Sequence, residues 1–188
     1  MLAGGGSRAC TAMRSYSDTL DPGDEPGWIS PESLDFLLPD IDECVLRTAV
    51  AESLGVKYLA SAALTDQRFP VSGVIFGRLP RIMVSLVVYR HAVGRAVNVI
   101  FVVSTGSPYT FCAPAVFAAL GVTDSLPKGL QLNVQGVDIS VSPSHAHFAD
   151  ANVLGQDFFA AGGVDLAVLS SRRVVHLLRP RRRQMSGD

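Results

Sequence analysis

Two histidines and two carboxylates near the end of the chain have side chains that could bind a metal ion. His145 and His147 are separated by one residue, and Asp150 and Asp157 follow them. Alternate residues of a strand point to the same face, so the two imidazoles could bind one zinc ion. Two ligands do not make a site, however, and the run Ser-Pro-Ser before them indicates an exposed loop. We therefore expect no bound metal and no cofactor.

A serine offers a second candidate chemistry. The run Ser104, Thr105, Gly106, Ser107 follows a long apolar stretch directly. A serine hydroxyl acts as a nucleophile only when a neighbouring base removes its proton and a third group orients that base. His145 or His147 would have to supply the base, and the spacing gives no sign of this. Cys112 could be a reactive thiol, but a cysteine in such a place is more often a small core residue.

Arginines concentrate at the C-terminus, where the last seventeen positions contain Arg172, Arg173, Arg179, Arg181, Arg182 and Arg183. Guanidinium groups bind RNA phosphates, anionic lipid head groups such as those of cardiolipin, and acidic protein surfaces. No aromatic residue alternates with these arginines, so sequence-specific reading of nucleic acid is not indicated. We treat residues 179–188 as an Arg-rich tail, with Arg179, Arg181, Arg182 and Arg183 as candidate partner-binding residues.

Composition limits the class of protein. The chain has 188 residues, 48% apolar content and a net charge of −1, which suits one folded domain with extensions and argues against a protein that coats nucleic acid. No apolar run approaches the roughly 18 residues that a transmembrane helix needs. The three cysteines form no Cys-x-x-Cys pair, so neither a zinc ribbon nor a disulfide scaffold is indicated.

The N-terminal part divides into two segments of opposite charge. Residues 1–16 contain Arg8 and Arg14, several small or hydroxylated residues and no acid, which is typical of a mitochondrial transit peptide cleaved after Tyr16. A short disordered terminus is the alternative. Residues 17–70 form an acidic, partly helical extension, with ten acids against one base between Ser17 and Leu54. It is either a docking surface for a basic partner or a solvated helical face.

Capping residues predict two helices in this extension. Ser30, Pro31 and Glu32 suit an N-cap, a first helical position and a first-turn acid, which predicts a helix through Leu38. A second helix is expected to begin at Asp40 as its cap and to end at Gly55.

Short β-branched runs separated by turns predict that residues 71–178 form a mainly β domain, a small barrel or sandwich with one short helix. We expect strands over 82–89 and 96–103, a hairpin of 130–134 with 137–141, and a hairpin of 165–169 with 174–178. In the first hairpin a two-residue loop pairs Val134 with Val137, Leu132 with Ile139 and Leu130 with Val141. A helix is expected from Pro114 to Leu120, ended by Gly121.

The stretch from Val97 to Phe111, which contains Ser104-Thr105-Gly106-Ser107, resembles the active-site strand and loop of retroviral-type (retropepsin-like) aspartic proteases. A second run, Val153-Leu154-Gly155 followed by Gln156, is similar to the family's later apolar-apolar-Gly motif and its short helix. The resemblance covers roughly residues 81–178, about half the chain. It implies a small closed β-barrel, in which Thr105 would hydrogen-bond across a twofold axis and Gly106 would permit a tight backbone approach.

The resemblance fails at the catalytic residue, because Ser104 stands where the family has its aspartate. In that mechanism two carboxylates share a proton and activate a water molecule, and a serine hydroxyl cannot replace either carboxylate. The segment between Gly121 and Asn152 also looks too short for a full substrate-covering flap. We therefore expect a catalytically inactive domain, an accessory subunit of a large, mitochondrial protein assembly.

Three alternatives stay open. The first is an active aspartic endopeptidase in which another carboxylate supplies the acid. The second is an RNA-binding module that uses the arginine tail. A homodimer formed through the face that carries Ser104 is also open, because single-domain members of the family pair there.

Overall fold

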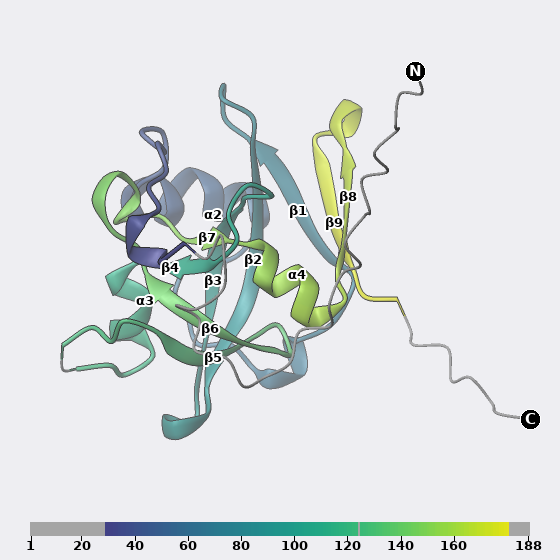
Figure 1. Ribbon diagram of the computed structural model, residues 1–188. Helices are drawn as coiled ribbons and strands as arrows, with labels where there is room; N and C mark the ends of the chain where they lie inside the picture. The colour runs from purple at the N-terminus through teal and green to yellow at the C-terminus, as the bar shows by residue number, and fades with distance from the viewer. Residues whose placement is uncertain (1–28, 124, 181–188) are drawn as a thin grey trace, which may run out of the picture. The chain divides into compact units, whose positions relative to one another are not determined.

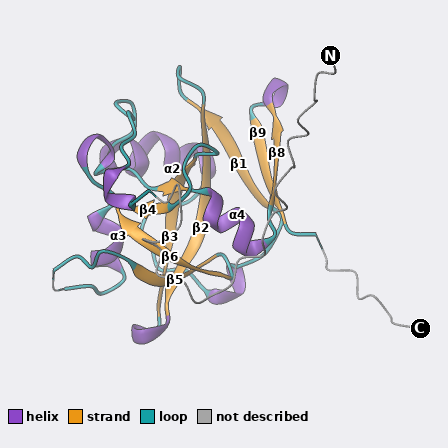
Figure 2. Ribbon diagram, viewed as in Figure 1, coloured by secondary structure: helices purple, strands orange, loops and turns teal. Residues whose placement is uncertain are grey.

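The β-branched runs from Val71 onward form a nine-stranded sheet in the computed structural model, which describes residues 29–123 and 125–180 (Figures 1 and 2). The strands are β1 (Val71–Phe76), β2 (Arg81–Arg90), β3 (Arg95–Val103), β4 (Thr110–Cys112), β5 (Leu130–Val134), β6 (Val137–Pro143), β7 (Val153–Leu154), β8 (Asp165–Leu169) and β9 (Val174–Leu178). The predicted mainly β class is confirmed. Residues 31–123 and 125–180 belong to one compact unit.

Six of the strands pair in a partly closed ring in the order β3-β7-β4-β6-β5-β2, because β2 also pairs with β3. The ring is thin at three joints. β4 meets β7 at one residue pair, Phe111 with Val153, whereas β2 meets β5 and β3 meets β7 at two residue pairs each. β1, β9 and β8 continue the sheet outward from β2, so β8 is its outermost strand (Figure 1).

Both predicted hairpins are confirmed, including the register of the first. Val134 pairs with Val137, Leu132 with Ile139 and Leu130 with Val141. The two loop residues, Gln135 and Gly136, have φ of 49° and 79°, as a tight two-residue hairpin turn requires. This register places the apolar side chains of both strands on the core face of the sheet.

The helices follow the capping residues only in part. α3 (Pro114–Ala119) begins at proline and is followed by Gly121 with a φ of 77°, as predicted. α4 (Gln156–Gly162) follows β7 directly. In the extension, α1 (Glu43–Val45), the π-helical turn η2 (Leu46–Val50) and α2 (Ala51–Leu54) run consecutively and end at Gly55.

Two predictions about the extension are wrong. Asp42 caps the second helix, accepting a 2.7 Å hydrogen bond from the Val45 amide, whereas Asp40 forms an ion pair with Arg81. Instead of a helix through Leu38, only the 3₁₀ turn η1 (Pro31–Ser33) forms. The residues after this turn run as an irregular segment along the sheet, because tertiary contacts of their side chains outweigh helix propensity. We call residues 34–41 the strap.

A single hydrophobic core connects the strands with the extension. Its largest fully buried side chains include Phe101, Phe111, Phe117, Phe148 and Phe158. Leu46, Val50 and Tyr58 from the extension belong to the same cluster, as do Leu38 and Ile41 from the strap. Residues 34–60 therefore contribute directly to the core that the strands enclose.

Among residues 29–123 and 125–180, no helix is long and apolar enough to cross a membrane. The expected transit peptide at residues 1–16 lies outside the described residues, as do Arg181, Arg182 and Arg183 of the tail.

Candidate functional site

The loop from Ser104 to Tyr109 joins the end of β3 to β4, and β7 fixes its position. β3 and β7 are parallel, with Val102 opposite Val153 and Val103 opposite Leu154. The Ser104 amide continues this pairing and donates a 3.0 Å hydrogen bond to the carbonyl oxygen of Leu154. The fold thus brings together the two sequence motifs, which lie about fifty residues apart in the chain.

Hydrogen bonds inside the loop and to α4 hold its shape. The Ser107 amide donates to the Ser104 carbonyl oxygen at 3.3 Å, and the buried Ser107 hydroxyl donates to the Tyr109 carbonyl oxygen at 2.6 Å. From α4, the Gln156 amide donates to the Ser107 carbonyl oxygen at 2.8 Å, and its side-chain amide donates to the Thr105 carbonyl oxygen at 3.1 Å. Hydrogen bonds within the loop and from α4 therefore fix its conformation.

The two motif glycines have different roles. A Cβ atom at Gly155 would overlap the backbone of Tyr109, whose nitrogen would lie only 2.9 Å away. At Gly106 no atom lies within 4 Å of such a Cβ atom. The tight approach expected of Gly106 is therefore absent within this unit, and Gly155 is the glycine that close packing requires.

The half-buried carboxylate of Asp157, at the start of α4, serves as a structural hydrogen-bond acceptor. Thr110 donates to it from its hydroxyl at 2.6 Å and from its amide at 2.9 Å, and the Phe158 amide donates at 2.8 Å. The Thr110 hydroxyl oxygen in turn accepts a hydrogen bond from the Gly155 amide at 3.1 Å. Burial raises the pKa of Asp157, and the hydrogen bonds from Thr110 partly oppose this shift. This network joins β4, β7 and α4 into one unit.

Ser104 itself has no base. No hydrogen bond of its hydroxyl to another described residue is found, and both histidines that could have served it are engaged with the strap. The ring nitrogens of His145 lie 2.7 Å from the Leu34 carbonyl oxygen and 3.2 Å from the Pro143 carbonyl oxygen. His147 bonds the carboxylate of Asp35 through its ring and its amide. The nucleophilic serine hypothesis therefore has no support in the geometry.

The same contacts separate the residues of the metal hypothesis. His147 pairs with Asp35, which lowers the pKa of the Asp35 carboxyl, whereas Asp157 pairs with Thr110. Within the part of the chain that the structure describes, no three His, Cys, Asp or Glu side chains gather as a metal site would need. Cys112 is fully buried, and burial raises the pKa of its thiol, so its environment is that of a core residue.

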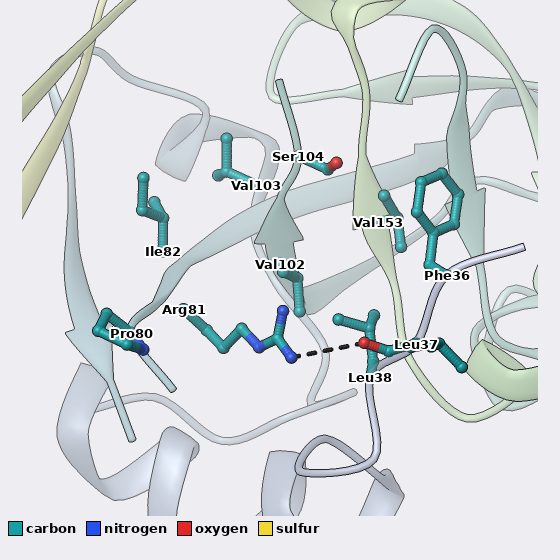
Figure 3. A pocket seen from close by; sticks show the side chains of 10 residues that line it. All are labelled: Phe36, Leu37, Leu38, Pro80, Arg81, Ile82, Val102, Val103, Ser104 and Val153. Atoms are coloured by element: carbon teal, nitrogen blue, oxygen red, sulfur yellow. Dashed lines mark hydrogen bonds between the residues drawn. The ribbon is translucent and has the colours of Figure 1, made fainter. Parts of the chain in front are cut away.

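A pocket of about 240 Å³ lies between the strap and the ends of β2, β3 and β7 (Figure 3). Ser104 is at one end of it, and its walls are mainly apolar, with Phe36, Leu38, Ile82 and Val153 among them. Its one charged side chain, Arg81, already bonds the Asp40 carboxylate at 2.9 and 3.2 Å and the Leu37 carbonyl oxygen at 3.5 Å. The pocket therefore offers apolar walls and a single hydroxyl, without a free charge.

Sequence reasoning missed Asn152, a buried polar residue that joins the extension, β3 and the residue after β4. Asn152, fully buried, donates from its side-chain amide to the Tyr58 hydroxyl and to the Ile100 carbonyl oxygen, each at 2.9 Å, and it accepts from the Ala113 amide at 2.8 Å. These partners lie 39 to 94 residues away in the chain, so no local pattern could have indicated them.

The described part of the basic tail ends at Pro180. Arg179 is exposed, and its guanidinium lies 5.9 Å from the centre of the Phe69 ring. Contacts of the tail with lipid, RNA or protein stay predictions.

Comparison of the chain with protein-family models, curated proteins and solved structures finds no match. The function is therefore inferred from the residues and geometry of the loop.

Proposed function

We propose that this chain is a retropepsin-like domain, a small closed β-barrel of that type, which lacks peptidase chemistry and serves as an accessory subunit of a larger assembly in mitochondria. The observation that carries the proposal is Ser104, which follows β3 and bonds the Leu154 backbone, at the position where the family has its aspartate. A hydroxyl cannot share a proton with a second acid near neutral pH, so the dyad that activates water is missing.

The elements around Ser104 support the fold part of the proposal. A strand, a loop and a second strand are followed, after a hairpin, by a short strand, Gly155 and a helix, in the order that the family resemblance implies. Between α3 and β7 the described residues contain β5, β6 and the 3₁₀ turn η5 (Ala146–Phe148), and they contain no further hairpin that could cover a substrate. An uncovered site disfavours binding of an extended peptide.

The well-packed loop supports the part of the proposal that gives the domain a structural, accessory role. The contacts of Ser107, Thr110, Gly155 and Asp157 stabilise the loop without the help of a catalytic group. A loop with these internal contacts can be retained for its shape, as an accessory subunit would require.

A peptidase assay tests the loss of chemistry. We expect no cleavage of a peptide library by the full chain between about pH 3 and 7, with or without a statyl-type inhibitor. Ser104→Ala should likewise show no cleavage, because the proposal gives the Ser104 hydroxyl no catalytic role. Inhibitor-sensitive cleavage that survives Ser104→Ala would overturn the proposal and favour an endopeptidase with its carboxylate elsewhere. Ser104→Asp then shows whether one restored carboxylate suffices for cleavage.

Native size fractionation of mitochondrial extract, followed by mass spectrometry, tests the accessory role. We expect the chain to co-migrate with an assembly far larger than its own 20.0 kDa. Absence from mitochondria, or migration at the mass of one or two chains, would contradict the proposal. Loss of co-migration when the exposed acids Glu32 and Glu52 are both changed to lysine, which leaves the core side chains in place, would locate the docking surface in the acidic extension.

A further inference from the structure

The outermost strand of the sheet, β8, has one free edge. It pairs antiparallel with β9 and, among the described residues, with no other strand. In an antiparallel pair every second residue directs its N–H and C=O groups away from the partner strand. The N–H and C=O groups on the outer side of β8, the outermost strand in Figure 1, therefore pair with no other strand among the described residues.

This edge lacks the features that usually prevent pairing. Protected edges carry lysine, proline or a bulge, and β8 reads Asp165-Leu166-Ala167-Val168-Leu169, with its one charge at the first position. Val168 is 41% exposed and Leu169 is 42% exposed, and Leu178 on β9 is 40% exposed. Such an edge is suited to receive another strand.

We propose that β8 pairs antiparallel with β8 of a second copy of this chain, around a twofold axis that passes through Ala167. In this register Leu166 lies opposite Val168 of the second copy, and Ala167 lies opposite its own equivalent. Within each copy Leu166 and Val168 are on the same face of the sheet as the fully buried Leu177 and Val175, with which they pair. The apolar face of the sheet thus continues across the axis.

Charge favours a second copy over an unrelated strand. Antiparallel pairing brings Asp165 of each copy to the end of β8 where the other copy has the turn η6 (Ser170–Arg172). Arg172 in that turn is exposed, and no described ion pair engages it. The twofold axis generates this acid–base arrangement twice, whereas another partner would have to match both ends independently.

This interface does not depend on the missing peptidase chemistry, and it differs from the pairing through the Ser104 face that the family resemblance suggested.

The measurement is light scattering of the purified full chain over a range of concentrations, with an expected mass of twice 20.0 kDa. Val168→Lys should yield monomers at the same concentrations, because an edge lysine blocks strand addition. Val93→Lys is the matched control, since Val93 is 46% exposed in the turn η4 (His91–Val93), and it should stay dimeric.

Cross-linking tests the register. Opposed Cα atoms of paired strands lie about 4.5 to 5.5 Å apart, within the range that a disulfide spans. In a Cys10→Ser, Cys44→Ser background, Ala167→Cys should form an intermolecular disulfide under mild oxidation, while the exposed control Ala49→Cys should not. A monomeric wild type, a dimer that survives Val168→Lys, or a dimer in which Ala167→Cys fails to cross-link would each overturn the proposal. A dimer in solution together with monomer- or dimer-sized migration in extract would leave this inference standing and contradict the accessory role.

Discussion

Gly155 is the residue at which the geometry of the loop is least tolerant. Any side chain there would meet the Tyr109 backbone, and moving that backbone would break the bonds that Ser107 and Thr110 make. We expect Gly155→Ala to lower the free energy of unfolding by about 3 kcal/mol, as overpacking against backbone does. Urea unfolding followed by circular dichroism measures this change.

The same substitution at Gly106 is the control. Its Cβ atom would meet no neighbour, so Gly106→Ala should change the stability by less than about 0.5 kcal/mol. Equal costs at both positions would show that Gly155 is not specially confined.

The raised pKa of Asp157 predicts that the free energy of unfolding depends on pH. Burial raises the pKa of Asp157 in the folded state above the ordinary 3.8. At a pH between 3.8 and this higher folded-state pKa, the folded chain holds a proton that the unfolded chain has lost. In that interval the free energy of unfolding falls as pH rises, because the unfolded state binds fewer protons. Urea unfolding measured from about pH 4 to 7 should therefore show that the free energy of unfolding of wild type, minus that of Asp157→Asn, decreases as pH rises.

The exposed Asp150→Asn is the matched control for that series, and its difference from wild type should lack this downward trend. A difference between wild type and Asp157→Asn that grows as pH rises would contradict the role given to Asp157.

At the scale of elements, the aromatic side chain of Phe36 is one of the contacts that hold the strap. The Phe36 ring meets those of Phe111 and Phe148 edge-on, with centroids 6.0 and 5.0 Å away. Because Phe36 is half-buried, we expect Phe36→Ala to cost about 2 kcal/mol of stability and to expose the strap to proteases. The neighbouring Leu37 is 73% exposed, so Leu37→Ala should leave both properties unchanged. Limited proteolysis compares the two variants, and equal cleavage rates would count against the packing argument.

The elements that the sequence predicts well are those whose own residues determine them. The β5–β6 hairpin has strict alternation and a Gln135-Gly136 turn, and α3 has proline at its start and Gly121 after its end. β4 and β7, with three and two residues, are too short to show any period. Favourable capping residues at positions 30–32 predict a helix through Leu38, whereas the conformation of the strap is set by contacts with residues about 40 to 110 positions away.

The candidate site likewise contains one contact that the sequence could predict and one that it could not. That Ser104 and Leu154 lie together follows from the order of the two motifs once a family resemblance is assumed, and the backbone bond between them agrees with it. The bond of Asp157 to Thr110 spans 47 residues and has no local signature. Its carboxylate therefore looked like a candidate ligand in the sequence, although it is a structural acceptor in the fold.

For the molecule as a whole, the shared core predicts that the helix of the extension and the strands unfold together. Leu46 in η2 is fully buried in the cluster that contains the β3 side chains. Leu46→Ala should cost about 3 kcal/mol, and in a single cooperative unit this loss applies to every core amide. Hydrogen exchange of the slowest β3 amides, measured by mass spectrometry, should then accelerate about a hundredfold, while the exposed Glu52→Ala should leave it unchanged. Acceleration confined to residues 43–54 would mean that the helix opens independently, and the strands would then hold a stable core without it.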